Sequence, residues 1–186
     1  VGARVGEAGD ALDDAADAWV RRQWQALLDA GLPSQGRIRA ETNRPHITLV
    51  AAEHLHPAID SGLSALSRRL PFPIELDGLV AFGGRRKTLA LKVVRDELLD
   101  ETQDEVLAVA RPWITALADH IEPEVWTPHI TLARRLTADE LDHATAIIGE
   151  PPAATATRLR RWDGDARQEK LFDADTGPQI KTIRGL

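Results

Sequence analysis

Hydrophobic positions recur at helical spacing in four stretches of the chain. The first covers residues 10–31, where acidic residues crowd the first turns, as the helix dipole favours, and a glycine and a proline end the pattern. The other three cover residues 56–70, 96–121 and 137–148. Pro112 should kink the third stretch or begin a second helix there. Thr137 and Glu140 form the capping-box pattern that predicts the start of the fourth.

Runs rich in β-forming residues lie between these stretches and predict strands. They cover residues 45–51, 72–82, 87–94, 126–134, 154–164 and 169–173. The last two runs are expected to pair as a hairpin, and a turn of glycines and cations, residues 83–87, joins the second run to the third. Residues 1–5 alternate weakly and predict one further short strand.

One of these strands occurs twice. The five residues Pro-His-Ile-Thr-Leu stand at 45–49 and again at 128–132, each time after a predicted helix. The order of elements also repeats, so that each half of the chain is expected to form one lobe. The sequence therefore predicts an α+β fold of two antiparallel-sheet lobes with outer helices, related by a pseudo-twofold axis, with a central active-site groove.

Composition narrows the class of protein. The 186 residues, 43% of them hydrophobic, suit a single domain, residues 1–186, with a core of its own. The net charge of −6 disfavours a protein that coats long nucleic acid, although an RNA end or a small nucleotide can still bind in a local basic pocket. The chain has no cysteine and no apolar run long enough to span a bilayer. We therefore expect a cytoplasmic monomer without disulfides or thiolate metal sites.

The repeated strand carries the candidate chemistry. Because side chains alternate along a strand, His46 and Thr48 share one face, as do His129 and Thr131 on the second copy. Two imidazoles facing one groove suit phosphoester chemistry, in which one takes a proton and the other gives one. The two threonine hydroxyls can donate to phosphoryl oxygens, where charge builds up.

These residues carry a resemblance to a known family. The segments RPHITLVA and TPHITLAR resemble the paired HxTx motifs of the two-histidine (2H) phosphoesterase superfamily, and most closely its bacterial 2′-5′ RNA ligase and RNA 2′,3′-cyclic phosphodiesterase group. The resemblance implies that His46 and His129 are the acid and base and that Thr48 and Thr131 hold the phosphate. It further implies hydrolysis of a 2′,3′-cyclic phosphate, on an RNA end or a small nucleotide, to a 2′-phosphate, without a metal or other cofactor. One departure is that this family usually opens with a strongly apolar strand, which residues 1–10 do not supply.

Two further residues are candidates for substrate binding. Alternation places Arg134 opposite the face of Thr131, as a solvated strand end, whereas the resemblance implies a contact with the phosphate. Phe82 is either a stacking surface for a base or part of the core. Trp126 and Trp162 are expected in the core or the groove wall, and the cations of the 83–87 turn at a solvated tip.

Two other functions stay open. One is a non-catalytic module of the same fold that binds a nucleotide or an RNA end. The other is a metal-dependent hydrolase that uses His54 and His56, although these two histidines are better explained as part of a surface loop. His120 and His143 fall on predicted helices and receive no role.

Overall fold

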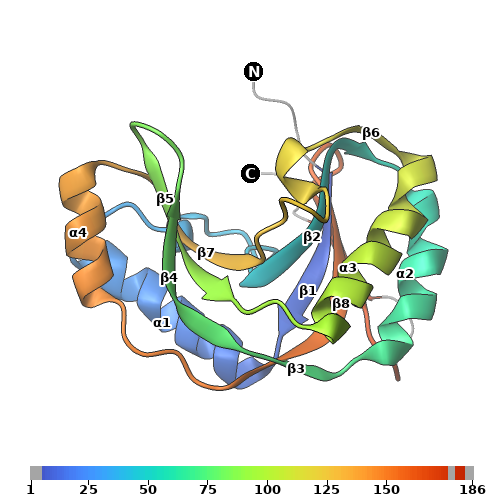
Figure 1. Ribbon diagram of the computed structural model, residues 1–186, viewed down its shortest axis with the longest axis horizontal. Coiled ribbons are helices and arrows are strands. Elements are labelled where there is room, and N and C mark those ends of the chain that lie inside the picture. Colours follow the sequence, from blue (N-terminus) through green and yellow to red (C-terminus); the bar gives the residue numbers. More distant parts are fainter. Residues whose placement is uncertain (1–5, 176–178, 183–186) are drawn as a thin grey trace.

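The computed structural model describes residues 6–175 and 179–182, which form an α+β fold of two antiparallel sheets (Figure 1). The larger sheet has the order β10-β9-β8-β1-β2-β6, with β3 paired to β8, and the smaller sheet has the order β4-β5-β7. The strands of the larger sheet are β1 Gly6–Leu12, β2 His46–Leu55, β3 Phe72–Ile74, β6 Ile114–Leu117, β8 Ala154–Asp163, β9 Gln168–Phe172 and β10 Gln179–Thr182. Those of the smaller sheet are β4 Leu76–Phe82, β5 Lys87–Val93 and β7 His129–Leu136.

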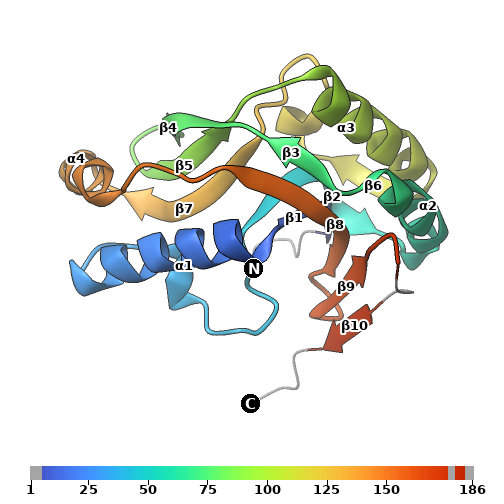
Figure 2. The same cartoon turned by 90° about the horizontal axis from the view of Figure 1, so that it is seen from below.

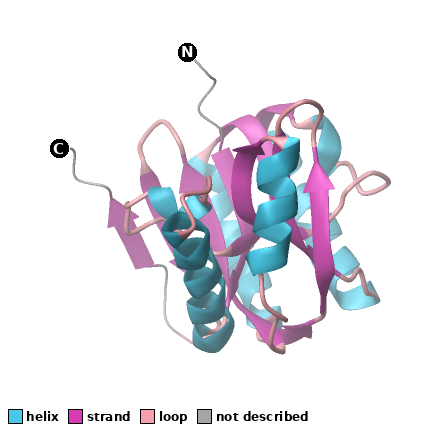
Figure 3. Ribbon diagram, turned by 90° about the vertical axis from the view of Figure 1, so that its left-hand side faces the viewer, coloured by secondary structure: helices cyan, strands magenta, loops and turns pink. Residues whose placement is uncertain are grey.

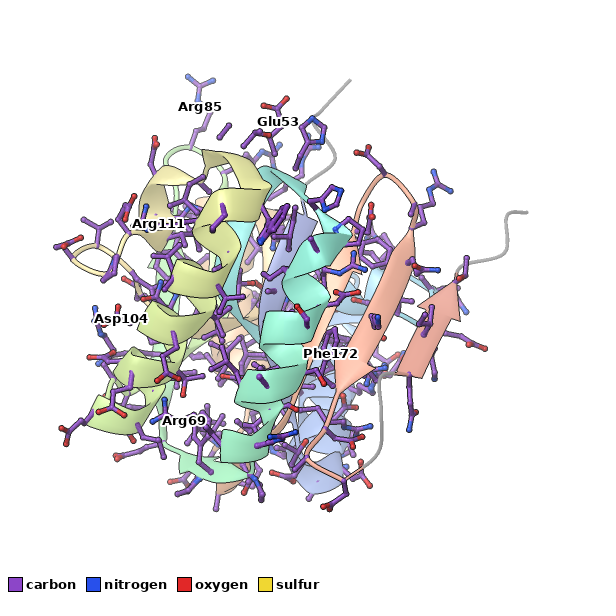
Figure 4. The ribbon with its side chains drawn as sticks, turned by 90° about the vertical axis from the view of Figure 1, so that its right-hand side faces the viewer. Glu53, Arg69, Arg85, Asp104, Arg111 and Phe172 are labelled. Carbon is purple, nitrogen blue, oxygen red and sulfur yellow. The ribbon has the colours of Figure 1, made fainter. Side chains whose placement is uncertain are left out.

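Helices cover the outer face of each sheet. The helices α2 (Asp60–Leu66) and α3 (Glu97–Ala110) pack on the larger sheet, whereas α1 (Asp14–Asp29) and α4 (Ala138–Ile147) pack on the smaller one (Figures 1 and 3). Arg69, just beyond α2, forms ion pairs with Glu101 and Glu105 and so ties the two helices of the larger sheet together (Figure 4). Among the described helices, none is long and apolar enough to cross a membrane.

The two lobes are interleaved along the chain, which corrects the prediction of one lobe per half. The smaller sheet takes β4 and β5 from the first half of the chain and β7 from the second. The larger sheet places β8, from the second half, beside β1 (Figure 2). The predicted pseudo-twofold relation holds between strand triplets, because β8-β1-β2 corresponds to β4-β5-β7. In this arrangement the motif strands β2 and β7 lie in contact where the two sheets meet.

The two motif strands share one irregularity. In β2, Thr48 pairs with Gly9 and Val50 with Ala8, so that Leu49 is an extra residue. In β7, Thr131 pairs with Ala90 and Ala133 with Leu89, so that Leu132 is the extra one. Each motif strand therefore has a bulge directly after its threonine, which reverses the alternation of the residues that follow.

Three segments differ from the predicted elements. Residues 10–12 belong to β1 and not to the first helix, because Asp13 accepts the N–H groups of Ala15 and Ala16 and so begins α1 only at Asp14. Residues 114–117 form β6 at the edge of β2 and not a helix, since the helix ends before Pro112. The single strand predicted at 72–82 is divided into β3 and β4, which belong to different sheets.

Other predictions fare differently. The capping box at Thr137 and Glu140 and the β8–β9 hairpin are confirmed. His54 lies at the end of β2 and not in a loop, because that strand runs longer than predicted. The strand β10 was not foreseen, and the strand predicted at residues 1–5 lies outside the described residues.

The middle of β1 holds a carboxyl group in an apolar environment. Asp10 pairs with Ile47 on one side and Leu159 on the other, and all three residues are fully buried. Neither side-chain oxygen of Asp10 has a hydrogen-bond partner among the described residues. Burial therefore raises the pKa of Asp10 to about 8.

This carboxyl predicts a pH-dependent stability. Since the folded state keeps a proton that the unfolded chain releases near pH 3.8, stability is greatest at low pH and is lost as the pH rises to about 8. Relative to Asp10→Asn, the free energy of unfolding of the wild type should fall by about 1.4 kcal/mol for each pH unit in this window. Urea unfolding at a series of pH values measures the difference. The exposed Asp14→Asn variant should keep the wild-type slope, and parallel curves for the wild type and Asp10→Asn would contradict the prediction.

Candidate active site

The two motif histidines have the same local geometry. His46 begins β2 and His129 begins β7. The Nδ1 atom of His46 donates to the carbonyl oxygen of Arg44 at 2.8 Å, and that of His129 donates to Thr127 at 2.7 Å. Because a carbonyl oxygen only accepts, each Nδ1 carries a hydrogen and each Nε2 is the nitrogen left for chemistry.

The threonines lie two residues further on the same face. Thr48 and Thr131 are half-buried, whereas the intervening Ile47 and Ile130 are fully buried. The backbone carbonyl of each threonine accepts a hydrogen bond from a buried indole: Trp126 Nε1 donates to Thr48 at 3.0 Å, and Trp24 Nε1 donates to Thr131 at 3.1 Å. Trp126 stands three residues before His129, so one motif is fastened directly to the other.

Arg134 lies on the groove side, which corrects the prediction from simple alternation. The bulge at Leu132 reverses the face of the residues that follow it. The Arg134 side chain consequently lines both the cavity beside His46 and the cavity beside His129. The structure thus brings His46, His129 and one guanidinium to a common region between the sheets.

The cavity on the His129 side has a volume of about 400 Å³. Its walls are Phe82, Thr88, His120, Val125, Thr127, His129 and Arg134. The ring of Phe82 lies 4.7 Å from that of His129, centroid to centroid, so Phe82 belongs to the groove and not to the core. His120, which received no role from the sequence, is exposed in a short 3-10 turn and faces the same cavity.

The cavity on the His46 side, of about 270 Å³, is more highly charged. Besides His46 and Arg134, its walls include Glu7, Arg44, Arg160 and Trp162. Oε2 of Glu7 lies 3.4 Å from Nε2 of His46 and 3.8 Å from Nη1 of Arg160. Together the two cavities have the size and mixed lining of a small-ligand site.

Charges in the groove perturb two titrating groups. Burial alone would raise the pKa of Glu7, but the hydrogen bond and charge of His46 and the charges of Arg160 and Arg134 lower it to about 2. Burial lowers the pKa of His129 below its ordinary 6.5, and Arg134, His120 and His46 lower it further against the hydrogen bond to Thr127. At neutral pH Glu7 is therefore a carboxylate and His129 is mainly neutral.

Several of these residues escaped the sequence analysis. Glu7, Arg44, Thr88, His120 and Arg160 come from separate segments and belong to no motif. Trp162 is a half-buried wall residue, as one of its two predicted positions allowed, and Trp126 is in the core.

The remaining candidates lie away from the groove. His54 and His56 line a different cavity, where His54 pairs with Asp165 and Nδ1 of His56 accepts the N–H of Ala58. Within residues 6–175 and 179–182, no three side chains of His, Asp or Glu are grouped so as to hold a metal ion. The cations of the 83–87 turn are at the exposed tip of the β4–β5 hairpin, where Arg85 projects outward (Figure 4).

Comparison with known proteins identifies relatives of this arrangement. The sequence profile of the 2′-5′ RNA ligase superfamily matches residues 12–168. A search among curated proteins returns no match. The crystal structure of E. coli LigT complexed with 3′-AMP is similar in fold, with 15% identity, a TM-score of 0.50 and coverage of 97% of this chain and 95% of that chain. The apo form of LigT has 17% identity at the same TM-score and coverage, and Kluyveromyces marxianus Usb1 has 10% identity and a TM-score of 0.49, with 97% and 98% of the two chains covered.

The indole bonds predict a stability effect at the motifs. Trp24→Phe and Trp126→Phe each remove the donor to a threonine carbonyl of a motif strand. Each should lower the free energy of unfolding by about 1–3 kcal/mol, the usual cost of a buried group that loses its partner. Denaturant unfolding measures this loss. Trp113→Phe is the matched control, because Trp113 is 45% exposed and should change stability little; equal losses in all three variants would contradict the assignment.

Proposed function

Because this chain belongs to the 2′-5′ RNA ligase superfamily, we propose that it is a metal-independent cyclic phosphodiesterase that opens the 2′,3′-cyclic phosphate of RNA ends or small nucleotides to a 2′-phosphate. The observation that carries the proposal is the matched pair of histidines. Both anchor Nδ1 on the carbonyl two residues back, and both line cavities that share Arg134. A module that only binds its ligand does not require two groups that titrate near neutral pH.

The reaction follows from the two imidazoles. One Nε2 takes a proton from a water molecule whose oxygen attacks the phosphorus atom. The bond from phosphorus to O3′ breaks, and the other Nε2 gives its proton to O3′. The product is a 2′-phosphate beside a free 3′-hydroxyl.

Donors in the groove suit the charge that develops on the phosphoryl oxygens. The hydroxyls of Thr48 and Thr131 lie on the same strand faces as the histidines, and Arg134 supplies a guanidinium between the two cavities. Such donors stabilise the transition state most when they are in place before reaction. In this proposal the four histidine and threonine side chains and Arg134 hold the phosphate.

Aromatic side chains stand ready for the bases. Phe82 lines the His129 cavity and Trp162 lines the His46 cavity, and either ring offers a stacking surface. LigT, which shares the fold, has been crystallised with 3′-AMP, and that nucleotide is consistent with a small nucleotide or RNA end as the ligand here. Ligation of a 5′-hydroxyl end to a cyclic phosphate, giving a 2′-5′ bond, would use the same acid and base in reverse.

Removing either histidine tests the proposal. His46→Ala and His129→Ala should each lower turnover of a nucleoside 2′,3′-cyclic phosphate by about a hundredfold to ten-thousandfold, the usual worth of one acid or base. The double variant should lose much less than the product of the two effects, because the pair acts as a unit. His143→Ala, exposed on α4, is the control and should keep wild-type turnover. Binding of the nucleotide without turnover by the wild type would favour the non-catalytic module instead.

The pH profile is a second test. If one histidine must be neutral and the other charged, kcat/KM should rise and then fall with pH, with two apparent pKa values that belong to the pair. The rising limb should lie below pH 6.5, since the pKa of His129 is lowered. Thr48→Val and Thr131→Val should reduce the rate and keep the bell shape, and a chelator should change nothing. A rate that climbs steadily with pH and collapses in chelator would indicate a metal-bound hydroxide.

A further inference from the structure

The two motif histidines differ in what faces their reactive nitrogen. Nε2 of His46 lies 3.4 Å from the Glu7 carboxylate on β1. Within the part of the chain that the structure describes, no carboxylate forms an ion pair with His129. The repeat thus places two identical side chains in environments of different charge.

We propose that Glu7 is a positioning residue that holds the second proton on Nε2 of His46, so that His46 is the acid and His129 the base of the reaction. The inference rests on the proposed function for its catalytic part. Its electrostatic part concerns the protein without substrate. Glu7 itself contacts no reacting atom in this scheme and acts through His46.

Glu7 can stay charged in the groove because cations surround it. Nη1 of Arg160, whose side chain is 4% exposed, lies 3.8 Å from Glu7. Arg160 is in turn held by the fully buried Glu169 at 3.0 Å, and Glu169 accepts two hydrogen bonds from Arg44, at 2.7 and 2.9 Å. The row Arg44, Glu169, Arg160, Glu7 and His46 alternates in sign when His46 carries its proton, so a charged His46 completes the row.

The His129 side has the opposite character. Its neighbours are Arg134 and His120, and the facing Lys92 on β5 is paired with Asp77. Strand pairing explains the contrast, because Glu7 lies across from Ala51 on β2, and Ala51 holds the place in the first motif that Arg134 holds in the second. Positive charge near His129 favours its neutral form, which agrees with its lowered pKa.

This assignment gives the groove a direction. Water is deprotonated by Nε2 of His129 and its oxygen bonds to phosphorus, while the electrons of the breaking bond go to O3′, which takes the proton from Nε2 of His46. The ribose whose oxygen leaves therefore lies on the His46 side, and the attacking water lies on the His129 side. After one turnover the proton returns from His129 to His46 by exchange with solvent.

Titration of the histidine rings by NMR, without substrate, tests the inference. The wild type and the Glu7→Gln variant are labelled on the imidazole rings, and His46→Ala and His129→Ala assign the signals. In the wild type His129 should lose its proton at lower pH than His46. In Glu7→Gln the loss from His46 should move to lower pH by about one unit or more, as expected when an opposite charge within a few ångströms is removed. His129 should move less.

Controls and kinetics complete the test. Glu53→Gln removes an exposed carboxylate from the same strand as His46 (Figure 4) and should move neither ring. Glu7→Asp, which keeps the charge on a shorter side chain, should fall between the wild type and Glu7→Gln. On a cyclic nucleotide, Glu7→Gln should shift the falling limb of kcat/KM to lower pH and reduce kcat/KM about tenfold on that side.

Two results would overturn the inference. One is that His46 and His129 titrate together in the wild type, or in reverse order, which is measurable even if Glu7→Gln does not fold. The other is that Glu7→Gln lowers KM and raises kcat/KM, which would mean that Glu7 only repels the phosphate. A wild type that turns over no cyclic nucleotide, with the ring order as expected, would refute the proposed function and leave the electrostatic assignment standing.

Discussion

The groove depends on one constraint, the extra residue that interrupts each motif strand after its threonine. A regular strand can place His129 and Thr131 on one face but sends Arg134 to the other. The bulge at Leu132 turns Arg134 back to the groove while leaving Ile130 and Leu132 in the core. The matching bulge at Leu49 forces a close approach to β1, where a Cβ atom at Gly9 would lie 2.2 Å from the carbonyl oxygen of Ile47. Glycine at this position is therefore part of the site.

The sequence predicted what local pattern determines. The repeated Pro-His-Ile-Thr-Leu strands, the capping box of α4 and the β8–β9 hairpin follow from residues close together in the chain. The α+β class with two antiparallel sheets followed from the order of such elements. The interleaving of the lobes did not, because pairing of β8 with β1 joins residues far apart that carry no mark of their partner. Helical spacing at 114–117 was misleading, since the edge of β2 supplies the hydrogen bonds that make this segment a strand.

The site was predictable to the same extent. His46, Thr48, His129 and Thr131 stand in a motif, so their shared faces could be inferred, and the structure brings the four into one region. Glu7 and Arg160 become neighbours of His46 only through the pairing of β1 with β2 and β8. The one available signal was the weak apolar character of residues 1–10. It is explained by two carboxyl groups on β1, Glu7 facing the groove and Asp10 facing the core.

A duplicated motif poses a physical problem for acid–base chemistry. Two histidines in identical surroundings would titrate together, and only part of the molecules would hold one neutral and one charged ring at any pH. A single substitution at a repeated position is enough to break this symmetry. Ala51 and Arg134 occupy the same place after their threonines, and the small alanine leaves room opposite β1 for the Glu7 carboxylate. The fold thus keeps the geometry of the two motifs alike while the charges around them differ, which lets each ring be fixed in a different protonation state.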